Sequence, residues 1–346
     1  MLTESKAGWR EVLLLAVSIG LALVIGDLLL RSFLPPSYPK SRYGWQPGEH
    51  HVRVSTVEDT TGHFREVTAR YFTHGFKRWG DPNSGKRKLL ILGDSTTEAN
   101  QVSNGEEWYA YLEGYFSNVE LFVSGVRGYG SLQEYLVLDD YIDTIKPNVI
   151  LWQFCGNDYE NNLYDLDLAS YPYNNHGLRP YLEQGAIVYR LPLPYAAVRE
   201  YSFIADRLLK EYDRYAFDRA TRDLMAFSRK RKAQETEESR QMMERWHEEA
   251  RRVTREIMAK VKQRARGTPI YAFSCTDQSE NEEQIISASA GIIYLPGITE
   301  YLNEQGAERE TRIPNDGHWN KLGHQLAGEK LVHLFERMEI LKEPTN

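Results

Sequence analysis

The chain has 346 residues, of which 41% are hydrophobic and 26% charged, and this length and composition allow one large globular domain or two smaller ones. Its formal net charge of -7 argues against a nucleic-acid-binding protein, because such a surface needs clustered Lys and Arg. A strong basic run at residues 229–232 is soon followed by Glu235, Glu237 and Glu238, a mixture that predicts a solvated helix face. We therefore expect no nucleic-acid partner.

Residues 12–33 are overwhelmingly apolar and long enough to cross a bilayer, which takes about 20 residues. The acidic Asp27 within this stretch must then lie near one membrane interface. No small-x-small cleavage site precedes the polar region, so we expect residues 1–34 to be an uncleaved, single-pass anchor. The alternative is a buried or interfacial helix. Basic residues at both ends leave the orientation open: Lys6 and Arg10 before the span, and Arg31, Lys40 and Arg42 towards or beyond its end.

Residues 35–85 are assigned to a stalk and a small β element. Pro35, Pro36 and Pro39 cannot continue a helix and predict a stiff stalk. Between residues 43 and 79, short alternating stretches broken by Gly and Asp predict an antiparallel element beside the main domain. The histidines here have no regular ligand spacing and are expected to be scattered surface residues: His50, His51, His63 and His74.

Residues 89–92 form a short apolar run, typical of a strand buried on both faces at the centre of a parallel sheet. Gly93 allows a sharp change of backbone direction, and residues 94–97 supply side chains that begin helices. Ser95 would lie at the carboxyl end of the strand, where open α/β sheets place ligands and where backbone N–H groups stabilise negative charge. A nucleophilic serine would work there. The alternative, favoured by this stretch alone, is that Asp94 or Ser95 merely caps a helix.

Two more predicted strands also end in polar or glycine-rich loops. Residues 119–124 lead into a glycine-rich loop that matches neither the dinucleotide-binding nor the P-loop spacing. Instead, one of its glycines could offer a backbone N–H to a reacting oxygen. Residues 148–154 form a third strand, followed by Asn157. Helical spacing of apolar residues precedes each of these strands, over residues 105–116 and 132–145. In a parallel sheet, the three polar strand ends share one edge.

From residue 159 the composition changes. Asn, Tyr and Pro predominate up to residue 195, which predicts irregular connections, whereas residues 199–266 are charged and helical. Together they form an insertion over residues 159–266, about a hundred residues and long enough to serve as a wall or lid of the site. The alternative is a peripheral helical hairpin without a functional role. His176 and Arg179 are the polar residues of interest within it.

A fourth and a fifth strand are predicted over residues 269–275 and 291–295. The two cysteines of the chain, Cys155 and Cys275, each end an apolar run, which is the usual place for a buried thiol. Neither has the His or Cys spacing of a metal site, so no metal is expected. Whether they pair across neighbouring strands is left open, because the sequence does not show the geometry that a disulfide needs.

The last informative stretch, residues 313–329, carries Asp316 and His318 in a glycine-containing loop before the terminal helix. Serine catalysis requires a histidine with a nearby carboxylate. The carboxylate orients the ring, and the other ring nitrogen takes the serine proton. His324, inside the helix, is expected to be structural.

Four short blocks occur in order between residues 88 and 340: Gly93-Asp94-Ser95, Gly128 in RGYGS, Gly156-Asn157-Asp158, and Asp316-Gly317-His318. In this order and placement they resemble the SGNH (GDSL-type) hydrolase family, which is named after its Ser, Gly, Asn and His. The chain looks like a membrane-anchored variety with an N-terminal extension and a helical insertion. The resemblance implies a three-layer α/β/α fold with a central, mostly parallel sheet, formed by residues 86–346 with the insertion.

The chain departs from the family pattern at two points. The family commonly has Asp three residues before the His, where this chain has Asn315, so Asp316 fits only a shorter D-x-H variant. The second-block glycine is ambiguous between Gly125, Gly128 and Gly130, and Gly128 is chosen for its distance after the strand.

The resemblance implies acyl transfer, in which Ser95 attacks an ester carbonyl with His318 as general base and Asp316 as its orienting partner. The backbone N–H groups of Ser95 and Gly128, with the side-chain amide of Asn157, would hold the oxyanion. No metal or cofactor is implied.

Three functions remain in competition. The first is a membrane-anchored esterase whose catalytic domain is periplasmic or extracellular and which hydrolyses an acyl ester, for example an O-acetyl group on a glycan. The second is an O-acyltransferase with the same triad, in which a sugar hydroxyl of a cell-envelope glycan replaces water. The third is a catalytically weak glycan-binding or assembly protein, against which the intact set of Ser95, Asn157, Asp316 and His318 argues. The expected partners are an ester-bearing small molecule or glycan, and the membrane through the N-terminal helix.

Overall fold

The computed structural model describes residues 8–342 except 35–36, 39, 59–60, 173–176, 223–235, 277–283, 285–286, 289, 307 and 315. Within this part of the chain a six-stranded sheet forms the centre, in the strand order β10-β9-β6-β4-β5-β3. Its strands run parallel except β3, which pairs antiparallel with β5 at one edge. The strands are β3 (Arg78–Trp79), β4 (Arg87–Gly93), β5 (Val119–Gly125), β6 (Val149–Phe154), β9 (Ile270–Ser274) and β10 (Ile293–Tyr294).

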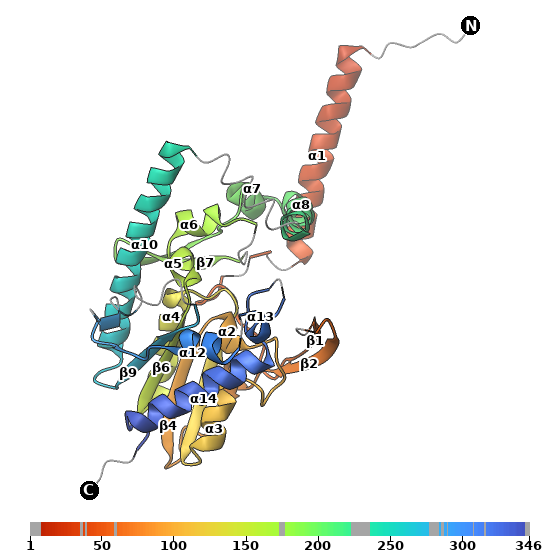
Figure 1. Ribbon diagram of the computed structural model, residues 1–346. Coiled ribbons are helices and arrows are strands. Elements are labelled where there is room, and N and C mark those ends of the chain that lie inside the picture. Colours follow the sequence, from red (N-terminus) through yellow and green to blue (C-terminus); the bar gives the residue numbers. More distant parts are fainter. Residues whose placement is uncertain are drawn as a thin grey trace.

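Helices cover both faces of this sheet because its central strands are apolar on both sides (Figure 1). Along β4, Leu90 and Leu92 belong to one buried core, whereas Leu89 and Ile91 belong to the other. The first core includes residues of α4 (Ser131–Ile145) and α10 (Glu237–Arg264), and the second those of α3 (Trp108–Tyr115), α12 (Ile298–Gln305) and α14 (Lys321–Arg337). The predicted fold class, a three-layer α/β/α arrangement around a mostly parallel sheet, is confirmed.

The five strands expected from the sequence are all present, with ends that differ by no more than about two residues, a normal uncertainty for element boundaries. The helix expected from residue 105 begins only at Trp108, because Gly105 has a φ of +95° and Glu107 is the N-cap. The predicted antiparallel element is also confirmed. Strands β1 (Val52–Glu58) and β2 (Phe64–Arg70) form a separate two-stranded sheet, followed by the short 3-10 turn η1 (Thr73–Gly75).

The expectation of irregular connections between residues 159 and 195 is wrong. The stretch contains α5 (Asn157–Asn162), α6 (Tyr164–Ala169), β7 (Arg179–Glu183) and β8 (Ala186–Arg190), and α7 (Ala196–Tyr201) follows. Buried polar pairs hold these short elements together. Arg179 pairs with Asp167 at 2.8 Å, and the Tyr181 hydroxyl donates to the same carboxylate at 2.6 Å. Composition does not reveal such contacts, because they join different elements.

The charged part of the insertion is helical, as expected, and contains α8 (Phe203–Arg222) and α10. The second half of α10 is buried through Ala250, Val253 and Ile257, and the helix packs on α4, α5 and α6. This half is therefore part of the layer that covers the sheet. The basic run at residues 229–232, His176 and the three stalk prolines lie outside the described residues.

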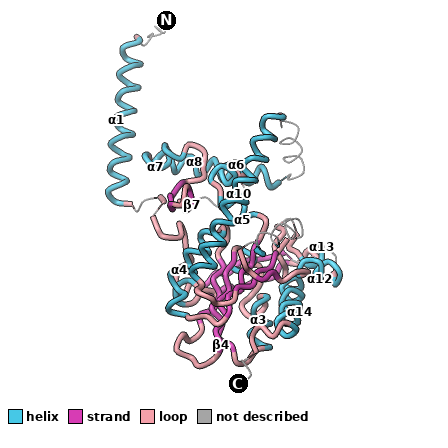
Figure 2. Tube along the Cα trace, turned by 90° about the vertical axis from the view of Figure 1, so that its left-hand side faces the viewer, coloured by secondary structure: helices cyan, strands magenta, loops and turns pink. Residues whose placement is uncertain are grey.

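Helix α1 (Trp9–Phe33) has no buried residues and stands away from the rest of the domain (Figures 1 and 2). Among the described residues it is the one helix that is long and apolar enough to cross a membrane, a test that a signal sequence also passes. The C-terminal end of α1 contacts the start of α8.

Candidate active site

The turn between β4 and α2 (Ser95–Glu98) places a serine at the carboxyl edge of the sheet. Asp94 is the residue that caps α2, because its carboxylate accepts a hydrogen bond from the Thr96 N–H at 2.9 Å. The simple capping role considered for this stretch therefore belongs to Asp94, and the Ser95 hydroxyl is available for other contacts.

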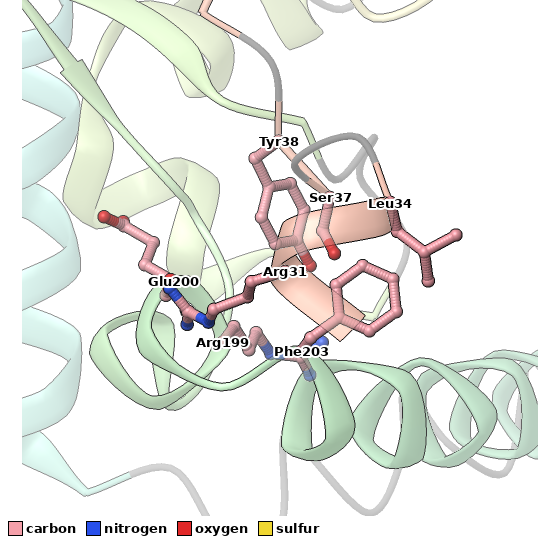
Figure 3. Close-up of a pocket in the computed structure, with 7 residues that line it drawn as sticks. All are labelled: Arg31, Leu34, Ser37, Tyr38, Arg199, Glu200 and Phe203. Carbon is pink, nitrogen blue, oxygen red and sulfur yellow. Dashed lines mark hydrogen bonds between the residues drawn. The ribbon is translucent and has the colours of Figure 1, made fainter. Parts of the chain in front are cut away.

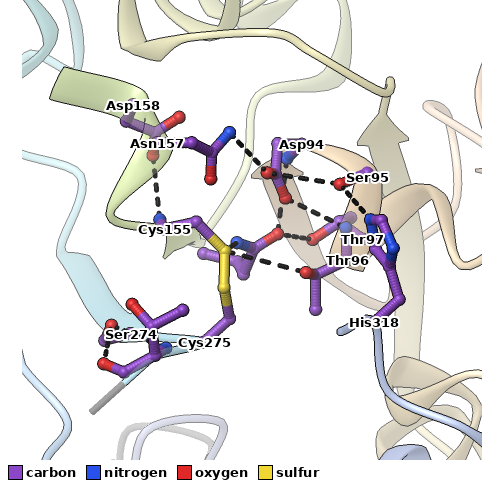
Figure 4. Close-up of a disulfide and its surroundings, with 12 residues drawn as sticks. Asp94, Ser95, Thr96, Thr97, Cys155, Asn157, Asp158, Ser274, Cys275 and His318 are labelled. Atoms are coloured by element: carbon purple, nitrogen blue, oxygen red, sulfur yellow. Dashed lines mark hydrogen bonds between the residues drawn. A yellow bond between two sulfur atoms is a disulfide. The ribbon is translucent and has the colours of Figure 1, made fainter. Parts of the chain in front are cut away.

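His318 lies beside this serine (Figure 4). Its Nε2 is 2.8 Å from the Ser95 Oγ, and its Nδ1 is hydrogen-bonded to the Asp316 carboxylate. The structure thus brings together the three residues that the sequence selects as catalytic, in the order nucleophile, base and orienting carboxylate. The D-x-H spacing allows this contact, since Asp316 reaches the ring from two positions before it.

A bonded loop between α13 (Glu308–Thr311) and α14 holds the histidine. The Ile313 N–H donates to the His318 carbonyl at 2.8 Å and closes the loop. Gly317 has a φ of +80°, a backbone conformation that favours glycine. Asn320 then caps the N-terminus of α14. These contacts fix the position of the ring from both sides.

Neighbouring charges shift the pKa values of both groups. Burial would lower the pKa of the His318 ring, but the hydrogen bond and charge of Asp316, with the charge of Asp94, raise it above its ordinary 6.5. Burial would likewise raise the pKa of Asp316, yet the hydrogen bond and charge of His318, with the charge of Arg127, bring it below its ordinary value. The pair therefore keeps the carboxylate charged and stabilises the protonated ring that forms when His318 takes a proton.

Asn157 is the first residue of α5, and in Figure 4 it approaches Ser95 from a different side than His318. The Asn157 Nδ2 donates to Asp94 Oδ2 at 3.3 Å, and the Ser95 Oγ lies 3.4 Å from the same oxygen. The amide and the hydroxyl thus share one neighbour, which places a side-chain N–H donor next to the serine.

Two of the three candidate glycines in the loop after β5 have other tasks. A Cβ on Gly125 would collide with the backbone of Glu98, so this glycine allows α2 to pack on β5. The Gly130 N–H donates to the Gln133 side chain at 3.2 Å at the start of α4. Gly128 lies between them and turns the loop with a φ of +69°. The choice of Gly128 as an oxyanion donor stays a prediction.

Beneath the serine, Cys155 and Cys275 form a disulfide with a Cα–Cα distance of 5.3 Å (Figure 4). The cysteines directly follow β6 and β9, which are neighbours in the sheet. The sequence leaves this pairing open, because strand adjacency is not visible in it. The Gln153 side chain connects the disulfide to α2, the helix that begins at Ser95: its Nε2 donates to Cys155 Sγ at 3.1 Å, and its Oε1 accepts from the Thr97 hydroxyl at 2.7 Å.

Two charged residues next to the site were missed by sequence reasoning. The Arg127 guanidinium is 3.4 Å from the Glu98 carboxylate, and Glu98 is buried and accepts a hydrogen bond from the Tyr71 hydroxyl at 2.7 Å. Arg127 also influences the pKa of Asp316 and of His318. Arg127 lies in the loop after β5, where the sequence pointed only to the glycines as functional residues.

Two other residues singled out in the sequence have structural roles. Arg179 is fully buried, pairs with Asp167 and stacks over the Trp45 ring at 4.9 Å, so it is a structural residue. Burial lowers the pKa of His324 to about 3, which keeps the ring neutral inside α14, as expected for a structural histidine.

An open groove of about 660 Å³ lies beside the histidine loop. It is lined by the end of β1, by β2 and by the region around the start of α14, including Val57, Arg65, Ile313, Asn320 and Leu322. The small β element, to which sequence analysis assigned no chemistry, therefore lies closer to the histidine loop than expected. The role of the insertion as a lid stays a prediction.

The sequence matches no family model, and no curated protein is significantly similar to it. The fold is similar to several solved structures at low identity. One is a member of the lipolytic G-D-S-L family from Veillonella parvula, with 11% identity, a TM-score of 0.40, and coverage of 72% of this chain and 99% of that chain. Another is the psychrotrophic esterase EstA from Pseudoalteromonas, with 10% identity, a TM-score of 0.41, and coverage of 73% and 98%.

A third is a family 3 carbohydrate esterase from Clostridium thermocellum, with 12% identity, a TM-score of 0.37, and coverage of 73% of this chain and 96% of that chain. At such low identities and TM-scores, these similarities say nothing about a substrate. The function has to be inferred from the residues of the site.

Proposed function

We propose that the chain is a membrane-anchored serine esterase of the SGNH type that hydrolyses an acyl ester through an acyl-enzyme. The observation that carries the proposal is the line of contacts from Ser95 through His318 to Asp316, with 2.8 Å between the hydroxyl oxygen and the ring nitrogen. This arrangement provides a nucleophile, a base within hydrogen-bonding reach and a carboxylate that fixes the ring.

In the first half of the reaction, the Ser95 Oγ attacks the ester carbonyl carbon while His318 Nε2 takes its proton. The carbonyl oxygen becomes an oxyanion, held by the N–H groups of Ser95 and Gly128 and by the Asn157 amide. When the tetrahedral intermediate collapses, the bond to the alcohol breaks, and His318 gives its proton to the leaving oxygen. The acyl group is then attached to Ser95.

In the second half, a water molecule replaces the alcohol. His318 Nε2 takes a proton from the water as its oxygen attacks the acyl carbon, and then returns that proton to the Ser95 Oγ as the carboxylic acid leaves. Asp316 stays charged throughout and stabilises the transient imidazolium, which agrees with the lowered pKa of Asp316 and the raised pKa of His318.

Two features support a location at the outer side of a membrane. Helix α1 carries no charged residue from Val12 to Gly26 and has no buried residue, as expected for a membrane-spanning helix. The Cys155–Cys275 disulfide forms and persists in oxidising compartments, such as the periplasm or the cell exterior. We therefore assign the catalytic domain to that side of the membrane.

The second candidate is an O-acyltransferase acting on a cell-envelope glycan. The open groove beside the histidine loop favours keeping it, because an acceptor hydroxyl could approach from there in place of water. Both enzymes form the same acyl-enzyme, so the acceptor alone decides between them. A catalytically weak glycan-binding protein, in contrast, would not need a serine hydroxyl bonded to a charged His–Asp pair.

A serine-directed fluorophosphonate tests the nucleophile. The wild-type protein should be labelled and Ser95→Ala should not, while Ser84→Ala in the loop before β4 serves as a control that keeps labelling. Labelling of Ser95→Ala would overturn the proposal. The reaction with p-nitrophenyl acetate is then measured with and without an oligosaccharide acceptor. A hydrolase passes the acetyl group to water, whereas a transferase passes it to the oligosaccharide.

A further inference from the structure

Helix α8 carries an exposed apolar stripe. Leu208, Tyr212 and Tyr215 follow one another at helical spacing, so they share one side of the helix. Their exposed fractions are 68%, 60% and 54%, and no described residue covers them. Lys210 and Arg214 lie on the opposite side. An exposed apolar side of this kind is typical of a helix that packs against another surface.

The stripe starts where α1 joins α8. The Asp27 carboxylate of α1 accepts hydrogen bonds from the Ile204 N–H at 2.9 Å and from the Ser202 hydroxyl at 3.2 Å. The Ile204 side chain lies against Gly26, where a Cβ would be 3.8 Å from its Cδ1. Ile204 is one turn before Leu208 and shares its side of the helix. The exposed stripe therefore continues the side of α8 from which α1 departs.

The joint between the two helices has further polar contacts. The Arg31 Nη2 donates to the Glu200 carbonyl at 3.0 Å, and its Nε pairs with Asp27 at 3.0 Å. A cavity of about 310 Å³ remains at this junction (Figure 3). Its two arginines are already paired, Arg31 with Asp27 and Arg199 with Asp213 at 2.8 Å. The cavity is thus a gap within a bonded joint and not a ready anion site.

The two helices cross steeply. In Figure 1, α8 is seen along its axis while α1 extends away from the domain, and Figure 2 shows α1 rising from the level of α7 and α8. If α1 crosses a bilayer, α8 runs along its surface near the depth of Asp27 and Arg31. Helix α7 adds Tyr201 and Val198, which are 80% and 48% exposed. Exposed aromatic residues at this level are typical of membrane interfaces.

From these contacts we infer that α8 is an interfacial helix whose Leu208, Tyr212 and Tyr215 side lies in the surface of the same phospholipid bilayer that α1 spans. The continuity of the stripe with the apolar span identifies the bilayer as the occupant. Interfacial helices bury their apolar side about 5–10 Å into the boundary between headgroups and acyl chains. The inference rests on the membrane anchor of the proposed function and is independent of its chemistry.

Single-cysteine labelling in lipid nanodiscs tests this arrangement with the full-length chain. The two native cysteines form the disulfide, so one introduced cysteine can carry the fluorophore NBD alone. The test positions are Tyr212→Cys and Leu208→Cys, and the matched control on the polar side of the same helix is Arg214→Cys. Leu21→Cys, in the middle of α1, reports on the anchor. Phosphatidylcholine and phosphatidylglycerol discs contain lipids with a nitroxide near the headgroup or deep in the acyl chain.

The headgroup nitroxide should quench the probes at residues 208 and 212 and shift their emission to shorter wavelength, while aqueous iodide should quench the probe at residue 214. The deep nitroxide should quench the probe at residue 21. Iodide quenching of residues 208 and 212 equal to that of residue 214 would overturn the interfacial position of α8, even with residue 21 in the bilayer. A water-exposed probe at residue 21 would overturn the anchor, and the interfacial helix with it. Neither outcome depends on esterase activity.

Discussion

The His318 Nε2 lies 2.8 Å from the Ser95 Oγ, although 223 positions separate the two residues in the chain. One follows the central strand and the other precedes the last helix, and the sheet brings both to the same edge. The contact requires no lid, because each residue is fixed by its own capped turn.

Asp316 should matter far more than its neighbour. In Asp316→Asn the ring loses the charged partner of its Nδ1, and kcat should fall by about 10²–10⁴-fold, as for other triads whose carboxylate is neutralised. Asn315→Ala, which changes the position expected from the common family spacing, should keep much of the activity. Initial rates with p-nitrophenyl acetate measure both variants. The reverse order of losses would assign the orienting role elsewhere.

The pH dependence should report the raised pKa of His318. A general base acts in its neutral form, so kcat/KM should rise with pH through a pKa above the ordinary 6.5 and then level off. In Asp316→Asn the hydrogen bond to a charged partner and its negative charge are lost, and the midpoint should move to lower pH. A pH–rate profile of each protein gives these midpoints. An unchanged midpoint in the variant would contradict the proposed pairing.

Asn157 should contribute to the rate and little to substrate binding. Removing one oxyanion donor typically costs about 10²–10³-fold in kcat, so Asn157→Ala should show this loss with a nearly unchanged KM. Fluorophosphonate labelling of Ser95 should slow as well, since its adduct also carries a developing oxyanion. A variant whose only defect is a raised KM would show that the amide binds the ground state instead.

The disulfide should support stability without taking part in the reaction. It closes a loop with a sequence separation of 120 residues, and loss of a native disulfide typically costs about 2–5 kcal/mol of unfolding free energy. The double variant Cys155→Ser with Cys275→Ser should therefore unfold at lower denaturant concentration and still react with fluorophosphonate at low temperature. Because the chain has two cysteines, a reductant acts on this bond alone and provides the matching treatment of the wild-type protein. Equal midpoints in urea would refute the stabilising role.

The sequence was sufficient for local features and for the order of the catalytic blocks. The run at residues 89–92 predicts a buried strand because four consecutive apolar residues fit no half-exposed strand. Gly93 after it leaves room for the side chains of Thr97 and Gln153, with which a Cβ would collide. The contact between His318 and Asp316 is also local, so its spacing in the chain is informative.

Features that depend on contacts between distant segments could not be predicted. The Cys155–Cys275 bond follows from the adjacency of β6 and β9, which no periodicity encodes. The buried pair of Arg179 and Asp167 turns a Tyr- and Asn-rich stretch into ordered elements, and its composition gives no sign of this. The interfacial position inferred for the exposed side of α8 depends on the contact of α8 with α1, which the sequence does not show.

The hydrogen bonds between Asp27 and the start of α8 would also limit which substrates the enzyme can reach. A domain on a flexible tether samples a large volume, whereas this domain would stay at a fixed height and tilt above the membrane. The edge of the sheet that carries the site lies on the side of the molecule from which α1 extends (Figure 1). Its turnover would then follow the number of ester groups per area of membrane and hardly respond to esters dissolved in bulk solution. An enzyme held in this way would act only at the membrane surface, and its natural substrate would be one that is delivered to, or held at, that surface.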